Sequence, residues 1–270
     1  TESGRSLAVD DVKGNVFAHI CRGSRKDIRD AVEAASKALG GWSSRTAYNR
    51  GQILYRMAEM LEGKADEFQQ VLSKTAGASR AEARREVEAS IDRLIAFAGW
   101  ADKYTQVVGC QNAVAGPYYN FTVPEPTGVT GVVAPNSPSL LGLITLIAPP
   151  LCAGNALVVL ASESTPIPAT VFAEVCATSD VPSGVVNIIT GLHEELIEHL
   201  AMHRNVQALV AANLDQEYAT AARLGAAENV KRVTVQDWSK QDWWDVTRAE
   251  SPWTIEPFVE MKTIWHPSSV

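Results

Sequence analysis

The sequence predicts an α/β fold built on a parallel sheet, and three observations support this class. Apolar segments typical of strands alternate with helical segments over residues 127–236, which indicates βαβ units. Residues 1–105 are dominated by amphipathic helical spacing, and residues 106–126 have the β-branched, aromatic, Gly and Pro content of a hairpin. We therefore expect a helical part, a parallel-sheet domain, a small set of strands from residues 106–126 and 256–266, and a Trp-rich connecting loop over residues 237–255.

The helical part follows a short extended segment, GNVFAHICRG. A helix is predicted from about residue 25, with Ser24 as N-cap and Asp27 in the first turn, and it is expected to end at Gly40-Gly41. Its apolar stripe consists of Ile28, Val32, Ala35 and Leu39. A second helix is predicted over residues 46–61, a shorter one follows it to about residue 75, and a long one is predicted over residues 80–104.

The parallel-sheet domain begins with a buried strand predicted over residues 129–133. Further strands are expected at 156–160, 185–190, 206–211 and 232–235, with helices at 139–152, 166–178, 194–203 and 216–227. The last segment, PFVEMKTIWHP, alternates apolar and polar residues and is interpreted as an exposed or edge strand near 257–266.

Composition excludes several classes of function. The chain has 270 residues, of which 46% are hydrophobic, enough for a full core. No apolar run is long enough to cross a bilayer and the first residues lack the order of a signal peptide, so we expect a cytoplasmic protein that does not bind a membrane. A net charge of -7 argues against a nucleic-acid surface, which needs clustered Lys and Arg.

Several segments carry a family resemblance. TGVTGVVAPNSP, LIAPPLCAGNALVVLASESTP, VPSGVVNIITG and AMHRNVQALV resemble, in order, the cofactor-binding domain of the aldehyde dehydrogenase superfamily, and FAGWADKY and FVEMKTIWHP resemble segments on either side of it. The resemblance implies a Rossmann-like sheet attached to a three-stranded oligomerisation element. The family strand VTLELGG corresponds to VTVQDWS, after which the chain passes directly to the terminal strand, so the resemblance implies that the catalytic domain is skipped.

The resemblance also tests each catalytic position. Family members use a cysteine nucleophile, a general-base glutamate and an oxyanion-binding asparagine. Asn136 matches the asparagine, whereas Gln236 stands at the position of the glutamate and cannot take a proton from water at neutral pH. All four cysteines lie at or before Cys176, so the nucleophile has no position. Asn136 also has a plain interpretation as a turn residue between Pro135 and Pro138.

The cofactor positions implied by the resemblance are only partly retained. Glu163 matches a ribose-hydroxyl ligand and Gly191 keeps the first glycine of the phosphate loop, and these two are the vestigial cofactor contacts. Glu163 could equally be a solvent-facing loop acid. The residues that depart from the family pattern are Pro135, Leu160, His193, Asn213 and Leu214. We therefore expect no NAD(P) binding or weak NAD(P) binding.

A histidine pair and a group of tryptophans are two further candidates for a site. His199 and His203 have the spacing of a metal pair, but no third ligand is evident, and no metal site is expected. The tryptophans of the connecting loop could stack on a ligand, although we favour an interface patch at the place where the catalytic domain would pack: Trp238, Trp243, Trp244 and Trp253.

The functional expectation is a partner subunit. The chain resembles the noncatalytic second half of the two-copy family-16 aldehyde dehydrogenases, as a separate polypeptide. The leading hypothesis is a noncatalytic subunit that docks onto and supports a full-length NAD(P)-dependent aldehyde dehydrogenase through the strands near 118–126 and 257–266. The alternatives are an aldehyde oxidoreductase component that binds NAD(P) and relies on a partner's catalytic residues, and a separate small-molecule binding module.

Overall fold

The computed structural model describes residues 4–268 and shows the predicted α/β class. Its centre is a five-stranded parallel sheet with the order β7-β6-β5-β8-β9. The strands are β5 (Val129–Val133), β6 (Ala156–Leu160), β7 (Val186–Ile189), β8 (Ala208–Ala212) and β9 (Arg232–Gln236). Every residue of β5, β6 and β8 is buried, as is usual for a parallel sheet that helices cover on both faces.

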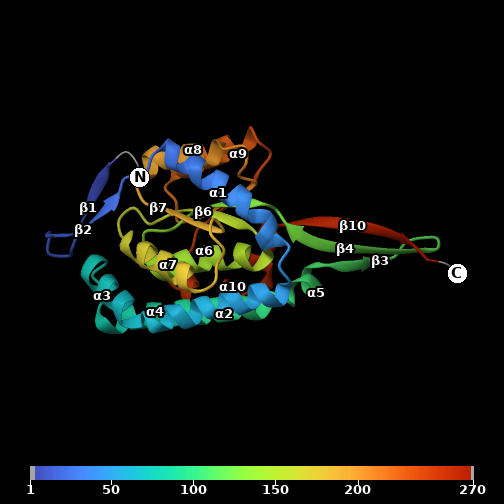
Figure 1. Ribbon diagram of the computed structural model, residues 1–270, viewed down its shortest axis with the longest axis horizontal. Coiled ribbons are helices and arrows are strands. Elements are labelled where there is room, and N and C mark those ends of the chain that lie inside the picture. The colour runs from blue at the N-terminus through green and yellow to red at the C-terminus, as the bar shows by residue number, and fades with distance from the viewer. Residues whose placement is uncertain (1–3, 269–270) are drawn as a thin grey trace.

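Two groups of helices cover the sheet (Figure 1). One face packs against α1 (Arg25–Ser43), α8 (His193–Met202) and α9 (Gln216–Ala227). The other packs against α6 (Ser139–Ala153) and α7 (Ile167–Thr178), and beyond them lie α2 (Ala47–Gly63), α3 (Ala65–Thr75) and α4 (Arg80–Trp100). Because α6 has helices on one side and the sheet on the other, all fifteen of its residues are buried.

A second sheet projects from one end of the molecule (Figure 1). It has the order β10-β4-β3 and is formed by β3 (Cys110–Asn112), β4 (Tyr118–Pro126) and β10 (Val259–Pro267). The strands β4 and β10 pair along nine residues in an antiparallel register, from Val259 opposite Pro126 to Pro267 opposite Tyr118. We call this sheet the projecting element. The terminal segment is thus the edge strand that its alternation predicts.

The helix starts follow from their capping residues. Ser24 and Asp27 form a capping box at α1, and Ser79 and Glu82 form another at α4. The helix α1 does not end at Gly40-Gly41, as the sequence suggests, but continues to Ser43. Trp42 is 1% exposed, and packing of this side chain in the core holds the last turn in helical form.

Other boundaries also differ from the predictions. The chain begins with a hairpin, of which β1 (Ser6–Asp10) was not foreseen and β2 (Val16–Cys21) is the predicted extended segment. The long fourth helix ends at Trp100, and a short helix, α5 (Tyr104–Val108), follows it. No helix among residues 4–268 is long and apolar enough to span a membrane.

Residues 237–255 form more structure than a connecting loop. They contain three short helical segments, η1 (Asp242–Trp244), α10 (Val246–Ala249) and η2 (Pro252–Thr254), and η3 (Glu256–Phe258) leads into β10. Buried residues such as Trp243 and Ala249 anchor these turns, and aperiodic burial of this kind is invisible to a search for regular spacing.

Candidate functional site

The candidate site residues follow the carboxyl ends of the parallel strands, where open α/β sheets bind ligands. Asn136 follows β5, Glu163 follows β6, Gly191 follows β7, Asn213 follows β8, and Gln236 ends β9. Because the strands are parallel and adjacent, the fold brings all five residues to one edge of the sheet, which we call the carboxyl edge.

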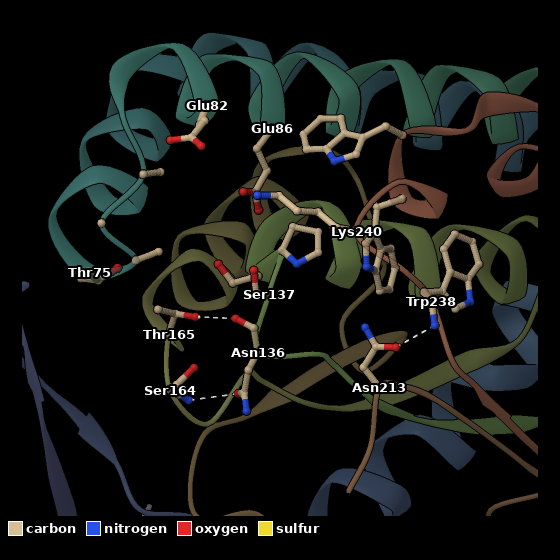
Figure 2. A pocket seen from close by; sticks show the side chains of 17 residues that line it. Thr75, Glu82, Glu86, Asn136, Ser137, Ser164, Thr165, Asn213, Trp238 and Lys240 are labelled. Carbon is tan, nitrogen blue, oxygen red and sulfur yellow. Dashed lines mark hydrogen bonds between the residues drawn. The ribbon is translucent and has the colours of Figure 1, made fainter.

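Asn136 holds the loop between β6 and α7. Its Oδ1 accepts hydrogen bonds from Ser162 Oγ at 3.1 Å, from the Glu163 amide at 3.1 Å and from the Ser164 amide at 3.2 Å. Its backbone carbonyl accepts one from Thr165 Oγ at 3.1 Å (Figure 2). The side-chain oxygen is therefore fully used within the chain, and the geometry supports the interpretation of Asn136 as a residue that fixes a turn.

Glu163 occupies the N-terminus of α8. Its carboxylate accepts a hydrogen bond from the His193 amide, the first helical residue, and the N-cap residue Leu192 provides no side-chain cap. The His193 ring is buried and its Nε2 lies 2.9 Å from the Ala161 carbonyl oxygen. The Glu163 side chain thus satisfies an amide at a helix N-terminus, where an external anion could otherwise bind.

Gly191 has a packing role at the same loop. Its φ of +153° lies in the region that favours glycine. A Cβ at this position would lie 2.9 Å from the Gly23 amide nitrogen, so any side chain would displace the segment after β2. This close approach explains the glycine without a ligand.

The start of α9 is surrounded by carboxylates. Burial raises the pKa of Tyr218 in α9, and nearby carboxylates raise it further. Glu163 comes from the loop after β6 and Glu194 from the first turn of α8, while α9 supplies its N-cap and a first-turn residue, Asp215 and Glu217. Leu160, at the end of β6, is fully buried and brings no charge to this edge.

Gln236 is bound to residues 237–255, which we call the tryptophan segment. Its Oε1 accepts a hydrogen bond from Trp238 Nε1, and its backbone carbonyl accepts one from the Asn213 amide at 2.9 Å. Asn213 in turn accepts a hydrogen bond from the Trp238 amide at 2.7 Å (Figure 2). The position that the resemblance assigns to the general base therefore serves as a structural contact.

The tryptophans do not form the expected exposed patch. Trp238 and Trp243 are 5% and 1% exposed and stack on each other with ring centroids 4.6 Å apart. Trp244 is half-buried beside the Arg85 guanidinium, and only Trp253 is well exposed. The interface interpretation was wrong for the first two, because their rings pack inside the chain.

A buried arginine fixes the tryptophan segment to the helices. Arg93 of α4 is 1% exposed and donates hydrogen bonds to Thr145 Oγ at 2.5 Å, to the Trp243 carbonyl at 3.1 Å and to Glu250 at 3.3 Å. Burial lowers the pKa of this guanidinium and Glu250 opposes the shift. No sequence pattern marks this network, because its members lie far apart along the chain.

The cysteine and histidine side chains are the remaining candidates for chemistry. Burial raises the pKa of Cys152 and of Cys176 to about 12, which excludes them as nucleophiles near neutral pH. Cys110 in β3 and Cys21 in β2 are exposed. Within residues 4–268, no three His, Cys, Asp or Glu side chains are placed to hold a metal ion, and His199 and His203 line a surface groove between α1 and α8.

The carboxyl edge also opens onto a cavity of about 750 Å³ (Figure 2). Its walls come from the turn between α3 and α4, the first half of α4, the loops after β5 and β6, and the tryptophan segment. Glu86 of α4 lines the cavity and is 9% exposed, and its Oε1 accepts hydrogen bonds from the amides of Leu140 and Leu141 at 2.8 and 3.2 Å. Sequence reasoning missed Glu86, although it lies between Ala83 and Val87 on the buried stripe of α4, where a carboxylate is unusual.

Comparison with known proteins identifies the family. Residues 1–240 match the model of the aldehyde dehydrogenase family. The chain belongs to this family. A hydroxyisobutyraldehyde dehydrogenase from Mycolicibacterium austroafricanum is 34% identical over 84% of the chain, and a mitochondrial benzaldehyde dehydrogenase from Antirrhinum majus is 30% identical over 87%.

Solved structures agree with this assignment. PnpE in complex with nicotinamide adenine dinucleotide has a TM-score of 0.82 and 26% identity over 86% of the chain. An aldehyde dehydrogenase from Brucella melitensis biovar abortus has the same score and identity over 87%. The chain spans less than half the length of these relatives, 44% of each curated protein and 47% and 48% of the two solved chains.

The family implies a dinucleotide, and the residues at the carboxyl edge can be tested against one. Phosphates bind where helix N-termini offer unengaged amides and positive potential. In this chain the His193 amide is taken by Glu163, acidic residues stand in the first turns of α8 and α9, and Leu160 is apolar. These residues do not fit the phosphates of a dinucleotide.

Proposed function

We propose that this aldehyde dehydrogenase family member is a noncatalytic subunit that docks its projecting element onto a full-length aldehyde dehydrogenase and supports it. In this respect it would correspond to the noncatalytic second half of the two-copy family-16 enzymes. The observation that carries the proposal is a contrast between two regions. The projecting element is fully formed, whereas the carboxyl edge lacks reactive groups.

The projecting element has the surface of a docking site. Its edge strand β10 pairs with β4 alone among the described strands, so its outer backbone groups have no strand partner within residues 4–268. Large apolar side chains on the element are exposed, among them Tyr119 and Trp265, each at 58%. An open strand edge beside exposed aromatic groups favours addition of a partner strand.

The carboxyl edge supports the noncatalytic part of the proposal. The buried thiols carry a pKa of about 12, Gln236 cannot act as a general base, and Glu163 occupies the α8 N-terminus. Asn136 is the one residue that matches a catalytic position of the family. Its side-chain oxygen accepts three hydrogen bonds from the loop after β6.

The test is co-expression with a full-length aldehyde dehydrogenase of the same organism, followed by native mass measurement and assay of the partner. We expect a complex whose mass is the sum of both chains and a partner that is more stable or more active in it. Trp265→Glu should abolish the complex, because a charge would have to be buried at the docked strand. Trp253→Glu is the matched control, since Trp253 is also 58% exposed but lies outside the element.

Two outcomes would overturn the proposal. One is an isolated monomer that leaves the partner unchanged at micromolar concentrations of both chains. The other is a complex that Trp265→Glu and Trp253→Glu weaken equally.

A separate small-molecule binding function is favoured by one observation, the cavity beside Glu86. Its volume lies within the usual range for ligand pockets. Binding of a small molecule in this cavity does not require catalysis and is compatible with a docking role.

A further inference from the structure

A groove runs along the outer surface of α2 and α4. These helices belong to the outer layer on their side of the sheet (Figure 1), and the groove between them has a volume of about 580 Å³. It passes over Gly51, where the helices approach so closely that a Cβ would lie 2.9 Å from the Ala98 carbonyl oxygen. A Cβ on Gly99 would meet no atom within 4 Å, so the space above this residue is open.

Exposed apolar side chains line both sides of the groove. Tyr48 and Tyr55 of α2 are 67% and 50% exposed, and Ile95 of α4 is 40% exposed. Residues seven apart on a helix lie on one face, and the two tyrosines are therefore about 10.5 Å apart along the axis of α2. Exposed tyrosines beside a groove favour binding of a partner, because the ring provides a large contact area and loses little conformational entropy.

The spacing of the two rings fits a polyproline II segment. Such a segment repeats every three residues, about 9.3 Å, so prolines one turn apart can contact the two tyrosines in succession. Its backbone carbonyls form no internal hydrogen bonds. The hydroxyls of Tyr48 and Tyr55 and the side-chain amide of Gln52 can donate to them, since these groups have no hydrogen-bond partner within residues 4–268. Proline-rich segments are recognised by aromatic-lined grooves of this kind.

The charges of the groove favour a basic residue on the segment. Arg56 is paired with Asp180, and Lys103 is paired with Asp102 at 2.9 Å. Glu59 also lines the groove and forms no ion pair within residues 4–268. It lies one helical turn beyond the second tyrosine on the same face of α2. A cation that follows the second proline would therefore meet an unpaired carboxylate.

We propose that the groove between α2 and α4 docks a proline-rich segment of a partner protein. Prolines one turn apart contact Tyr48 and Tyr55, and an arginine of the segment pairs with Glu59. The inference does not depend on docking of the projecting element, because the groove and that element are formed by different residues.

The experiment is fluorescence anisotropy of a labelled synthetic peptide, titrated with the full chain. The peptide consists of three Pro-Pro-Ala repeats followed by arginine. One control peptide has alanine in place of every proline, and the other has norleucine in place of arginine. We expect a dissociation constant below about 1 mM for the first peptide. The alanine peptide should bind at least about tenfold more weakly because it is not preorganised, and the norleucine peptide about threefold more weakly because it lacks an exposed ion pair.

Filling the groove tests where the peptide binds. Gly99→Gln places a side chain in the open space between the helices and should weaken binding by at least about tenfold, while glutamine is a better helix former than glycine and the fold is kept. Gly40→Gln is the matched control, because Gly40 is also an exposed helical glycine whose Cβ would meet no atom within 4 Å. It should leave binding unchanged.

Substitutions of the lining side chains test each contact. Tyr55→Ala should weaken binding about tenfold, whereas Tyr119→Ala, at an exposed position of the projecting element, should leave it unchanged. Glu59→Gln should weaken binding of the arginine peptide about threefold and leave binding of the norleucine peptide unchanged, because the ion pair is already absent from that complex.

Several results would overturn the proposal. They are equal binding of the proline and alanine peptides, equal effects of Gly99→Gln and Gly40→Gln, and no binding at millimolar concentration. Tighter binding of the alanine peptide would indicate that a helix occupies the groove, and a dimer of the chain that Gly99→Gln dissociates would indicate a second copy there. Both results contradict a proline-rich occupant. Every substituted residue is exposed, so circular dichroism should show an unchanged fold in each variant.

Discussion

The carboxyl edge and the projecting element lie in one chain and have opposite characters. At the carboxyl edge, polar side chains bind one another: Glu163 caps α8, Asn136 holds the loop after β6, and Gln236 accepts from Trp238. On the projecting element, large side chains such as Trp265 are exposed and the outer edge of β10 is open among the described residues. The polar side chains of the carboxyl edge are therefore hydrogen-bonded within the chain. The outer backbone groups of β10 have no strand partner within residues 4–268.

This difference indicates where an external partner would gain most. A ligand at the carboxyl edge must compete with hydrogen bonds that the chain already makes, whereas a partner at β10 would satisfy unpaired backbone groups and cover apolar surface.

The largest expected contrast between the two regions is in thiol reactivity. Cys110 of the projecting element is exposed, whereas Cys152 and Cys176 pack around the sheet with a pKa of about 12. At pH 8, a three-unit difference from an ordinary thiol lowers the thiolate fraction about a thousandfold. Labelling followed by peptide mass analysis should therefore modify Cys110 in the folded chain and the two buried cysteines only in urea. Comparable labelling rates in the folded chain would contradict the burial of the core.

Asn155 joins the amino ends of β5 and β6 to the base of β10, and its replacement should have the largest effect on stability. Its side chain is fully buried and accepts from the Gly128 amide at 2.9 Å while donating to the carbonyls of Pro150 and Phe258 at 3.1 and 3.0 Å. Asn155→Ala removes three hydrogen bonds and leaves the Gly128 amide unpaired, while the Pro150 and Phe258 carbonyls keep their bonds to the Asn155 and Thr127 amides. The variant should lower the free energy of unfolding by about 3 kcal/mol. Urea denaturation measures this, with the exposed Asn205→Ala as control. A loss no greater than the control would show that the base of β10 is held by other contacts.

The effect of the carboxylates around the starts of α8 and α9 can be tested by removing their charge. Glu163→Gln keeps an oxygen that can accept from the His193 amide, so the double variant Glu163→Gln, Glu194→Gln should fold and bind NAD about tenfold more tightly than the unmodified chain. Energy transfer from tryptophan to NADH reports the affinity, and Glu198→Gln, later on the same helix, is the control. Tight NADH binding by the unmodified chain would contradict our conclusion about the carboxyl edge.

The smallest effect concerns Lys231, just before β9 at the opposite edge of the sheet. Burial lowers its pKa to about 8, from 10.5, although its Nζ donates to the His203 carbonyl at 2.8 Å. Between pH 8 and 10.5 the unfolded chain binds more protons than the folded chain, so this residue's destabilising effect is full below pH 8 and is relieved as pH rises. Lys231→Met should gain up to about 1 kcal/mol at pH 7, after allowance for solvent screening and the lost hydrogen bond. The difference should shrink towards pH 10 in urea melts, and a constant difference would contradict the shift.

The fold class was predictable because the strands of a parallel sheet are buried and alternate with amphipathic helices. The alternation of apolar and polar residues in the sequence located β10, although most of its side chains are exposed. It could not find the short helical segments of residues 237–255, because turns of three or four residues carry no periodic signal. It also overestimated the tryptophan patch, since a single sequence does not show that Trp238 and Trp243 stack on each other inside the chain.

The candidate site was predicted in position but not in its contacts. The residues after each strand gather at one edge, as parallel topology requires. That Glu163 turns onto the α8 N-terminus depends on the meeting of two loops 30 residues apart. Glu86 and Arg93 carry a weak signal, as charged residues on the buried face of α4, and their partners lie on α6 and beyond, which only the assembled fold reveals.

Hydrogen exchange of the chain mixed with a full-length aldehyde dehydrogenase tests the central claim most directly. If the projecting element docks, amides of residues 259–267 should exchange more slowly in the mixture, while those of α8 and α9 at the carboxyl edge should exchange at an unchanged rate. Unchanged exchange across β10, or protection confined to the carboxyl edge, would contradict the account.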